Sequence, residues 1–244
     1  MTNIEHEIME FKHVSFGYAD DKMILKDVCL RLVQGKTYAL VGPTGGGKST
    51  TAGLMARLYD PNQGLVEFHD RDIRMYQPEE LATKIGFILQ EPFLFTGTVG
   101  ENIRYGNQAL DNVSNAELVE LLEKDELSGL VRVFENGLDT QINNNSENIS
   151  LGQKQLIAFM RVILRKPDLL IMDEATANID TVTEQLLNDI INKLPSTTTK
   201  VIIAHRLNTI KNADEILFIN GGRIQEAVDF DEALDLIENS RKSS

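Results

Sequence analysis

Residues 42–50 read Gly42-Pro43-Thr44-Gly45-Gly46-Gly47-Lys48-Ser49-Thr50 and follow directly after the apolar run 37–41. They match the pattern G-x-x-x-x-G-K-[ST], in which a glycine-rich turn joins a strand to a helix. Glycines allow the backbone to close tightly and to point consecutive N–H groups at an anion. The helix that follows adds the partial positive charge of its N-terminus. The segment therefore predicts a buried strand over 37–41, a phosphate-binding loop, and a helix over 50–59.

Two side chains of this loop suit nucleotide chemistry. Lys48 places a full positive charge at the terminal phosphates, and Ser49 offers a hydroxyl to Mg²⁺. Such a local field explains how a chain with a net charge of −13 could hold a polyphosphate. The alternative is a chance glycine-rich loop, and the strand and helix patterns on either side argue against it.

A second acidic site lies in residues 167–174, which read Pro-Asp-Leu-Leu-Ile-Met-Asp-Glu. Four apolar residues before an acid predict a central strand that ends at Asp173. Because ligands bind at the carboxyl ends of strands in open α/β sheets, we expect Asp173 to hold Mg²⁺ through water. Glu174 would face the attacking water as general base or orienter. The alternative is an acidic pair that only ends a surface strand.

The composition excludes several classes of protein. With 244 residues, 42% of them hydrophobic and 25% charged, the chain is an ordinary globular sequence that needs no disulfides for its core. Its acidic balance argues against binding nucleic acid through a basic surface. The single cysteine, Cys29, excludes an internal disulfide and suits a reducing compartment. Neither a membrane-spanning segment nor a signal peptide is predicted, so we expect any membrane anchor to lie elsewhere.

Together, residues 42–50 and 169–174 resemble the nucleotide-binding domain of an ABC transporter. Five further segments are similar to motifs of that family and follow in its order, from about residue 8 to 236. They are the aromatic Tyr18, the Q-loop glutamine Gln90, the signature segment 149–155, the D-loop segment 175–180 and the switch histidine His205. Within the family, the segments 58–61, 98–103 and 205–210 are similar to those of exporters.

The resemblance implies an α/β fold of the P-loop NTPase class. Its parts are an ABC-type core with a mixed central sheet, an antiparallel β lobe and an inserted α-helical subdomain. We expect one nucleotide-binding domain over 1–244, with a RecA-like core at about 1–90 and 166–244 and the helical subdomain at about 91–165. The apolar patterns agree with strands over 7–34 and near 37–42, 84–89, 168–173 and 200–204, and with helices over 152–164 and 181–194.

The resemblance also implies a role for each matched residue. Tyr18 stacks on adenine, and Gln90 reaches Mg²⁺ and reports the γ-phosphate to a transmembrane partner. His205 donates to the γ-phosphate and holds the water at Glu174, which makes Lys48, Gln90, Glu174 and His205 the expected catalytic set. The expected Mg²⁺ ligands are Ser49, Gln90 and Asp173.

The signature segment acts on a second cassette, according to the resemblance. Ser150, Gly152 and Gln153 open a helix whose N-terminus caps the ATP held by the other domain's loop, and Asp180 lies at that interface. By itself, Ser150 also suits a helix N-cap.

Two departures from the family pattern stand out. Leu151 replaces the first glycine of LSGGQ and Ile149 its leucine. The side chain of Leu151 either crowds the nucleotide of the partner cassette or points away from it, so both a second copy and a paralogous chain stay open as the partner. The run Asn143-Asn144-Asn145 stands where exporters show a loop containing glycine and glutamate. Asparagine tolerates the left-handed backbone of such a turn, but the charge expected at Asn144 is gone. In the family, this loop contacts the transmembrane domains, so the change concerns coupling to them and leaves the expected ATP chemistry as it stands.

We therefore expect a Mg²⁺-dependent ATPase cassette that powers export at the cytoplasmic face of a membrane through head-to-tail dimerisation with a second cassette. The transmembrane domain is expected on the same full-length chain, with a separate subunit as the second option. An alternative is a nucleotide-gated regulatory cassette with low turnover, which Leu151 keeps open and Glu174 and His205 disfavour. A relative that acts in DNA repair or translation lacks support, because neither a long coiled-coil insert nor a second cassette is present.

Overall fold

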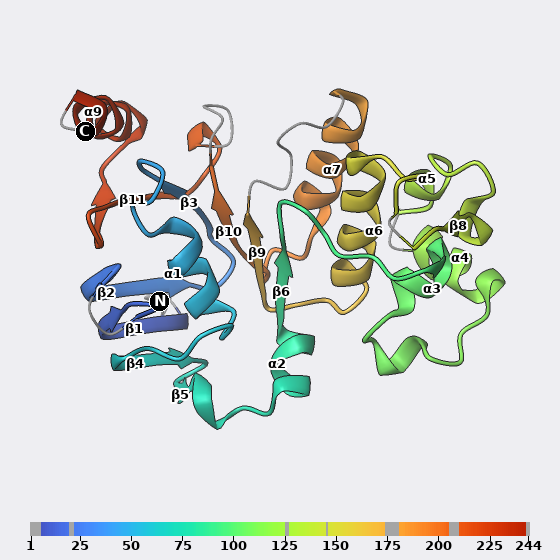
Figure 1. Cartoon of the computed structure of the whole chain (residues 1–244), viewed down its shortest axis with the longest axis horizontal. Helices are drawn as coiled ribbons and strands as arrows, with labels where there is room; N and C mark the ends of the chain where they lie inside the picture. The colour runs from blue at the N-terminus through green and yellow to red at the C-terminus, as the bar shows by residue number, and fades with distance from the viewer. Residues whose placement is uncertain are drawn as a thin grey trace, which may run out of the picture. The chain divides into compact units, whose positions relative to one another are not determined.

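The computed structural model describes residues 6–19, 22–124, 127–144, 146–173, 181–204 and 210–242. The chain forms two compact units (Figure 1). The first comprises Met1–Phe87, Asp168–Glu174 and Pro195–Ser244, and the second comprises Ile88–Pro167 and Ala175–Leu194. Within the described residues, no helix is long and apolar enough to cross a membrane.

An antiparallel sheet in the order β2-β1-β4-β5 forms one layer of the first unit. Its strands are β1 (Glu7–Phe16), β2 (Leu25–Val33), β4 (Gln63–Phe68) and β5 (Arg71–Asp72). In β2, the side chains of Leu30 and Leu32 are buried while that of Arg31 is exposed, as expected for a strand with one face on a core. The predicted antiparallel lobe is confirmed.

The second sheet of the first unit has the order β12-β11-β3-β10-β9-β6. Its strands are β3 (Thr37–Val41), β6 (Ile85–Ile88), β9 (Leu169–Asp173), β10 (Thr199–Ile203), β11 (Glu215–Asn220) and β12 (Arg223–Ala227). The pairs β3–β10, β9–β10 and β3–β11 are parallel, whereas β11 and β12 form an antiparallel hairpin. The sheet is therefore mixed, as predicted, and each predicted strand is present.

Helices α1 (Lys48–Met55), α2 (Pro78–Lys84) and α9 (Phe230–Lys242) and the short 3₁₀ helix η1 (Ile73–Met75) complete the first unit. The prediction that the helix after the glycine-rich loop extends to Tyr59 is wrong. Arg57 takes a positive φ of 52°. The N–H groups of Arg57 and Leu58 then bond back to the carbonyls of Leu54 and Gly53, at 3.1 and 2.8 Å. This is a Schellman motif, which ends a helix.

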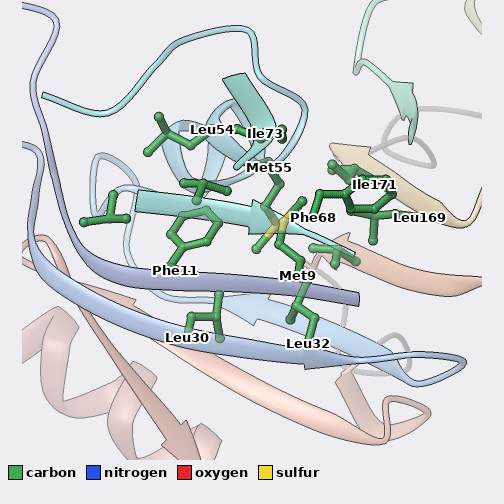
Figure 2. Close-up of a cluster of buried hydrophobic side chains, with 14 of the residues drawn as sticks. Met9, Phe11, Leu30, Leu32, Leu54, Met55, Phe68, Ile73, Leu169 and Ile171 are labelled. Carbon is green, nitrogen blue, oxygen red and sulfur yellow. The ribbon is translucent and has the colours of Figure 1, made fainter. Parts of the chain in front are cut away.

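One apolar cluster joins both sheets of this unit to α1 (Figure 2). Its members include Met9, Phe11, Leu30, Leu32 and Phe68 from the antiparallel sheet, Leu54 and Met55 from α1, Ile73 from η1, and Leu169 and Ile171 from β9. Burial of such a side chain contributes about 1.5–3 kcal/mol. The cluster therefore holds α1, and with it the loop that precedes α1, against both sheets.

The second unit is mainly helical. It contains α3 (Val99–Arg104), α4 (Asn115–Lys124), α5 (Ser128–Val131), α6 (Leu151–Ile163), α7 (Thr181–Lys193), the 3₁₀ helices η2 (Gln108–Leu110) and η3 (Gly137–Asp139), and the paired short strands β7 (Gly97–Thr98) and β8 (Gln141–Ile142). The helices predicted over 152–164 and 181–194 are present as α6 and α7. In the turn before α6, the described residue with a left-handed backbone is Ser146, with a φ of 52°.

Candidate nucleotide-binding site

The glycine-rich loop follows β3, and its backbone leaves no room for side chains at several positions. Gly42 and Gly47 have φ values of 139° and 114°, in the region that favours glycine. A Cβ atom at Gly42 would lie 2.1 Å from the carbonyl oxygen of Ile219, and one at Gly46 would lie 2.7 Å from the same oxygen. The loop therefore packs directly on the backbone of β11, which explains why these positions need glycine.

Lys48 is the first residue of α1 and is nearly buried. Its Nζ atom donates to the carbonyl oxygens of Gly42 and Pro43, at 2.9 and 3.0 Å. The ammonium group therefore lies over the loop. The N-cap of α1 is Gly47, which has no side chain to cap the helix, and the first turn of α1 contains no acidic residue. The positive end of the helix is thus available to an anion bound in the loop.

A cavity of about 300 Å³ opens between the loop and Tyr18. It is lined by Tyr18, Ile24, Thr44, Gly45, Gly47, Lys48, Ser49 and Thr50. The hydroxyl of Tyr18 lies 3.2 Å from Thr50 Oγ1, while the residue is 57% exposed. The structure thus brings the predicted base-stacking ring and the predicted phosphate loop to one cavity. An exposed aromatic face beside a basic, glycine-lined loop suits a nucleotide.

Asp173 lies at the carboxyl end of β9, at the same edge of the sheet as the loop. It is in register with Ile203 of β10, which is in turn in register with Leu40 of β3. Because neighbouring strands lie about 4.8 Å apart, Asp173 is roughly 10 Å from the strand that leads into the loop. This is the expected position for an acid that meets the metal on bound phosphates.

The oxygens of Asp173 and Ser49 are hard donors, which are the ligands that Mg²⁺ prefers. Ser49 is exposed at the cavity and Asp173 is half-buried. In the part of the chain that the structure describes, no group of three or more His, Cys, Asp or Glu residues could hold a metal by itself. The residues therefore fit a Mg²⁺ ion that takes its further ligands from phosphate and water.

The signature segment forms the start of α6 in the second unit. Ser150 is its N-cap in a reciprocal capping box: Gln153 N–H donates to Ser150 Oγ at 3.1 Å, and Ser150 N–H donates to Gln153 Oε1 at 2.9 Å. The predicted N-cap role of Ser150 is confirmed. Gly152 is buried and Leu151 is half-buried. The capping box uses the oxygen of the Ser150 hydroxyl as acceptor and leaves its proton for another acceptor.

Gln90 follows β6 and is exposed. Its backbone carbonyl accepts a hydrogen bond of 3.1 Å from the side-chain amide of Gln155, which is fully buried in α6. This contact was not predicted from the sequence. A polar residue within the apolar face of α6 is the signal that could have indicated it.

Arg161 is a half-buried polar residue of α6 whose contacts were not predicted from the sequence. Its guanidinium donates to the carbonyls of Asn102 and Phe93, at 2.8 and 3.2 Å. Burial, together with the nearby charge of Arg165, lowers the pKa of Arg161 to about 10. The side chain of Asn102 in turn bonds both the N–H and the carbonyl of Phe95, at 2.8 and 2.9 Å. Segment 90–95 is thus tied to α3 and α6.

Three predicted site residues, Glu174, Asp180 and His205, lie outside the described residues. So does Asn145 of the asparagine run. Asn144 accepts a hydrogen bond of 2.9 Å from Thr96 Oγ1.

The fold and the glycine-lined cavity define a P-loop ATP-binding cassette. Comparison with known proteins supports the same class. A family model described as ABC transporter matches residues 25–177. The chain therefore belongs to the ABC transporter family.

The chain is similar to curated proteins of this family and to a solved exporter structure. The ABC transporter ATP-binding protein YfiC of Bacillus subtilis (strain 168) is 42% identical over 93% of this chain and 37% of its own length. The mitochondrial ATP-binding cassette sub-family B member 10 of Mus musculus is 40% identical over 89% of this chain and 31% of its own length. A solved structure of a bacterial Atm1-family ABC exporter with ATP bound superposes with a TM-score of 0.82.

That structure shares 32% identity and covers 100% of this chain and 43% of the exporter chain. The predicted fold class, an ABC-type P-loop NTPase, is thus confirmed, and the chain is an exporter-type ATP-binding cassette. It spans less than half the length of these three relatives.

Proposed function

We propose that this chain is the Mg²⁺-dependent ATPase cassette of an exporter, in which ATP hydrolysis powers transport across a membrane. The observation that carries the proposal is the glycine-lined cavity, in which Lys48 is folded over the loop while Asp173 ends a strand at the same sheet edge. This arrangement combines a polyphosphate cradle with a hard acidic oxygen, as phosphoryl transfer requires.

Each residue of the site has a part in the proposed reaction. The N–H groups of the loop and Lys48 hold the phosphates, and Tyr18 stacks on the base. Ser49, Asp173 and Gln90 hold Mg²⁺, which neutralises charge on the phosphate oxygens when bound. Glu174 orients the attacking water and accepts its proton, while His205 donates a hydrogen bond to the γ-phosphate.

Two cassettes complete each other's sites in this proposal. The start of α6, with Ser150, Gly152 and Gln153, caps the ATP on a second cassette, and Asp180 lies at that interface. A transmembrane domain couples the motion to export, so the cassette works at the cytoplasmic face of a membrane. We assign a RecA-like core to about 1–90 and 166–244 and a helical subdomain to about 91–165.

One observation favours a second candidate function. Leu151 is the first residue of α6 and is half-buried, at a position where the family signature has glycine. A branched side chain there crowds a neighbouring nucleotide. With a paralogous partner, the chain would then form one competent and one degenerate site and act as a nucleotide-gated regulatory cassette with low turnover.

The first test compares Glu174→Gln with Glu120→Gln, the same change on the exposed surface of α4. We expect Glu174→Gln to abolish ATP turnover while it retains ATP binding and to form a dimer with Mg²⁺-ATP, measured by light scattering. Glu120→Gln should turn over ATP like the parent chain. If turnover persists in Glu174→Gln, the assigned base is wrong.

A chain that binds ATP but remains a monomer would favour the paralogous partner over a second copy. Failure of the parent chain to bind ATP would overturn the proposal as a whole. A Lys48→Ala variant, expected to lose ATP binding, controls for binding outside the loop.

A further inference from the structure

Three aromatic rings form a cluster beside the nucleotide cavity. The ring centroids of Tyr18 and Tyr59 lie 5.0 Å apart, those of Phe16 and Tyr18 5.2 Å, and those of Phe16 and Tyr59 5.5 Å. The planes of Tyr18 and Tyr59 are nearly perpendicular, at 80°. These distances and angles are those of favourable aromatic contacts. We refer to Phe16, Tyr18 and Tyr59 as the aromatic cluster.

The cluster holds Tyr18 at its exposed position. Phe16 is buried, whereas Tyr18 is 57% and Tyr59 is 43% exposed. An isolated ring with that exposure would sample several rotamers, since little packs against it. Here the ring of Tyr59 contacts Tyr18 on one side, and Thr50 Oγ1 holds its hydroxyl at 3.2 Å. Both the body and the tip of the Tyr18 ring are therefore restrained.

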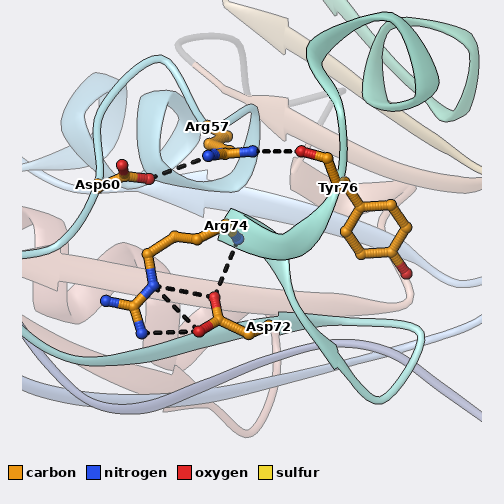
Figure 3. Close-up of polar contacts among 5 residues, drawn as sticks. All are labelled: Arg57, Asp60, Asp72, Arg74 and Tyr76. Carbon is orange, nitrogen blue, oxygen red and sulfur yellow. Dashed lines mark hydrogen bonds and ion pairs between the residues drawn. The ribbon is translucent and has the colours of Figure 1, made fainter.

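The backbone that carries Tyr59 is fixed by the end of α1. Leu58 N–H closes the Schellman motif on the carbonyl of Gly53, at 2.8 Å. The side chain of Arg57 bonds Asp60 Oδ1 at 3.3 Å and the carbonyl of Tyr76 at 2.7 Å (Figure 3). In the sequence, Tyr59 thus lies between Arg57 and Asp60, whose side chains are hydrogen-bonded to each other.

The place of the Tyr59 ring depends on a glycine in α1. A Cβ atom at Gly53 would lie 3.3 Å from two carbon atoms of the Tyr59 ring, closer than ordinary contact. The absence of that atom lets the ring lie directly on the helix. Three residues after Tyr59, Asn62 Oδ1 accepts the N–H of Gly17 at 2.7 Å. The segment that carries Tyr59 therefore also holds the backbone next to Tyr18.

We propose that Tyr59 is a positioning residue for recognition of the nucleotide base, because it holds the Tyr18 ring in the orientation on which a purine stacks. Tyr59 is not among the residues that line the cavity, so it acts through Tyr18. The described contacts of Tyr59 are made by its ring, so the ring and not the hydroxyl carries the effect. This inference rests on the proposed nucleotide-binding function.

The test measures the binding of Mg²⁺-ATP and of inorganic triphosphate to the whole chain. We expect Tyr59→Leu to raise the Kd for ATP about two- to tenfold and to leave the Kd for inorganic triphosphate unchanged, because only ATP has a base. In steady-state assays, KM for ATP should rise while kcat stays the same. Tyr59→Phe keeps the ring and should bind ATP like the parent chain.

Gly53→Ala gives an independent perturbation, because it displaces the Tyr59 ring without removing it. It should weaken ATP binding in the same direction and again spare inorganic triphosphate. The matched control is Tyr105→Leu, which removes a tyrosine of similar exposure from the second unit. It should not change the affinity for either ligand.

Two results would overturn the inference. One is an unchanged affinity for ATP in Tyr59→Leu. The other is an equal loss of affinity for ATP and inorganic triphosphate, which would mean a general disturbance of the loop. Both presuppose that the parent chain binds ATP and that Tyr18→Ala weakens this binding. If either of those fails, the proposed function or the stacking role of Tyr18 has failed instead.

Discussion

The side-chain amide of Gln155 in α6 donates a hydrogen bond of 3.1 Å to the backbone carbonyl of Gln90. Gln155 is fully buried, and its Oε1 atom has no hydrogen-bond partner among the described residues. The bond joins the predicted metal ligand to the helix whose first turn is the signature segment. Since Arg161 also bonds Phe93, segment 90–95 is tied within the second unit.

Replacing Gln155 with methionine tests this tether. We expect the free energy of unfolding to stay within about 1 kcal/mol of the parent value, because the variant also removes an unsatisfied buried oxygen. Amide hydrogen exchange in segment 90–95 should rise about fivefold, as expected for the loss of one hydrogen bond. Mass spectrometry of peptides that cover this segment measures it. Gln108→Met, at an exposed position in η2, is the matched control, and unchanged exchange in Gln155→Met would refute the tether.

Two alanine substitutions in the glycine-rich loop should separate stability from binding. Gly42→Ala forces a Cβ atom to within 2.1 Å of a backbone oxygen of β11, so we expect a loss of on the order of 3 kcal/mol in unfolding free energy. The Cβ atom of Gly45→Ala would meet no atom of the described residues within 4 Å, so the strain comes from its φ of 78°, which costs about 1 kcal/mol.

Urea unfolding measures both effects. Gly45 lines the cavity, so its variant should lose ATP affinity out of proportion to its small loss of stability. Equal unfolding free energies of the two variants would show that the close approach of Gly42 to β11 is not what requires glycine in the loop.

Ser150 offers a way to separate the capping role from the proposed role at a partner's nucleotide. Ser150→Ala should lower the unfolding free energy by about 1 kcal/mol, because the capping box is lost. Ser150→Asp retains a good N-cap and should be as stable as the parent chain. It places a negative charge where a γ-phosphate is expected. In the Glu174→Gln background, Ser150→Asp should therefore abolish the ATP-dependent dimer in light scattering, and a persisting dimer would contradict the composite site.

The alkaline stability of the chain should depend on Tyr38. Burial raises the pKa of Tyr38 to about 12, from an ordinary value of 10.0. Between these values the folded chain keeps a proton that the unfolded chain has released. This contribution to stability is therefore complete below pH 10 and is lost as the pH rises toward 12, by on the order of 2 kcal/mol.

Arg161 changes the stability in the opposite direction. Because its pKa is lowered in the folded state, its contribution to the unfolding free energy increases as the pH rises past about 10. The measurement is thus the difference in unfolding free energy between the parent chain and Tyr38→Phe across this range. The difference should shrink as the pH rises. At neutral pH the variant should be less stable by about 1–3 kcal/mol, because Val33 N–H loses the hydroxyl that accepts it at 2.7 Å. A difference independent of pH would contradict the raised pKa.

The strands of the parallel sheet could be predicted because they are short apolar runs with clear ends. The apolar run 37–41 lies between Gly35 and Gly42, and β3 spans the same residues, Thr37–Val41. The end of α1 could not be predicted, because the apolar pattern continues to Leu58 while Arg57 adopts a left-handed conformation. The polar Gln155 within the apolar face of α6 indicates a buried contact, but its partner and that of Arg161 could not be predicted, since both are backbone carbonyls of a distant segment.

The amino-acid sequence by itself determined the fold class and the chemistry of the loop. Local steric rules allow a glycine-rich turn between a strand and a helix to point its N–H groups at an anion. Only the tertiary structure decided that Tyr18 and Thr50 meet at one cavity and that Tyr59 lies on Gly53. It also decided that Gly42 faces a carbonyl of β11. These contacts join segments far apart in the chain, and they arise from sheet register and from the shared burial of apolar side chains.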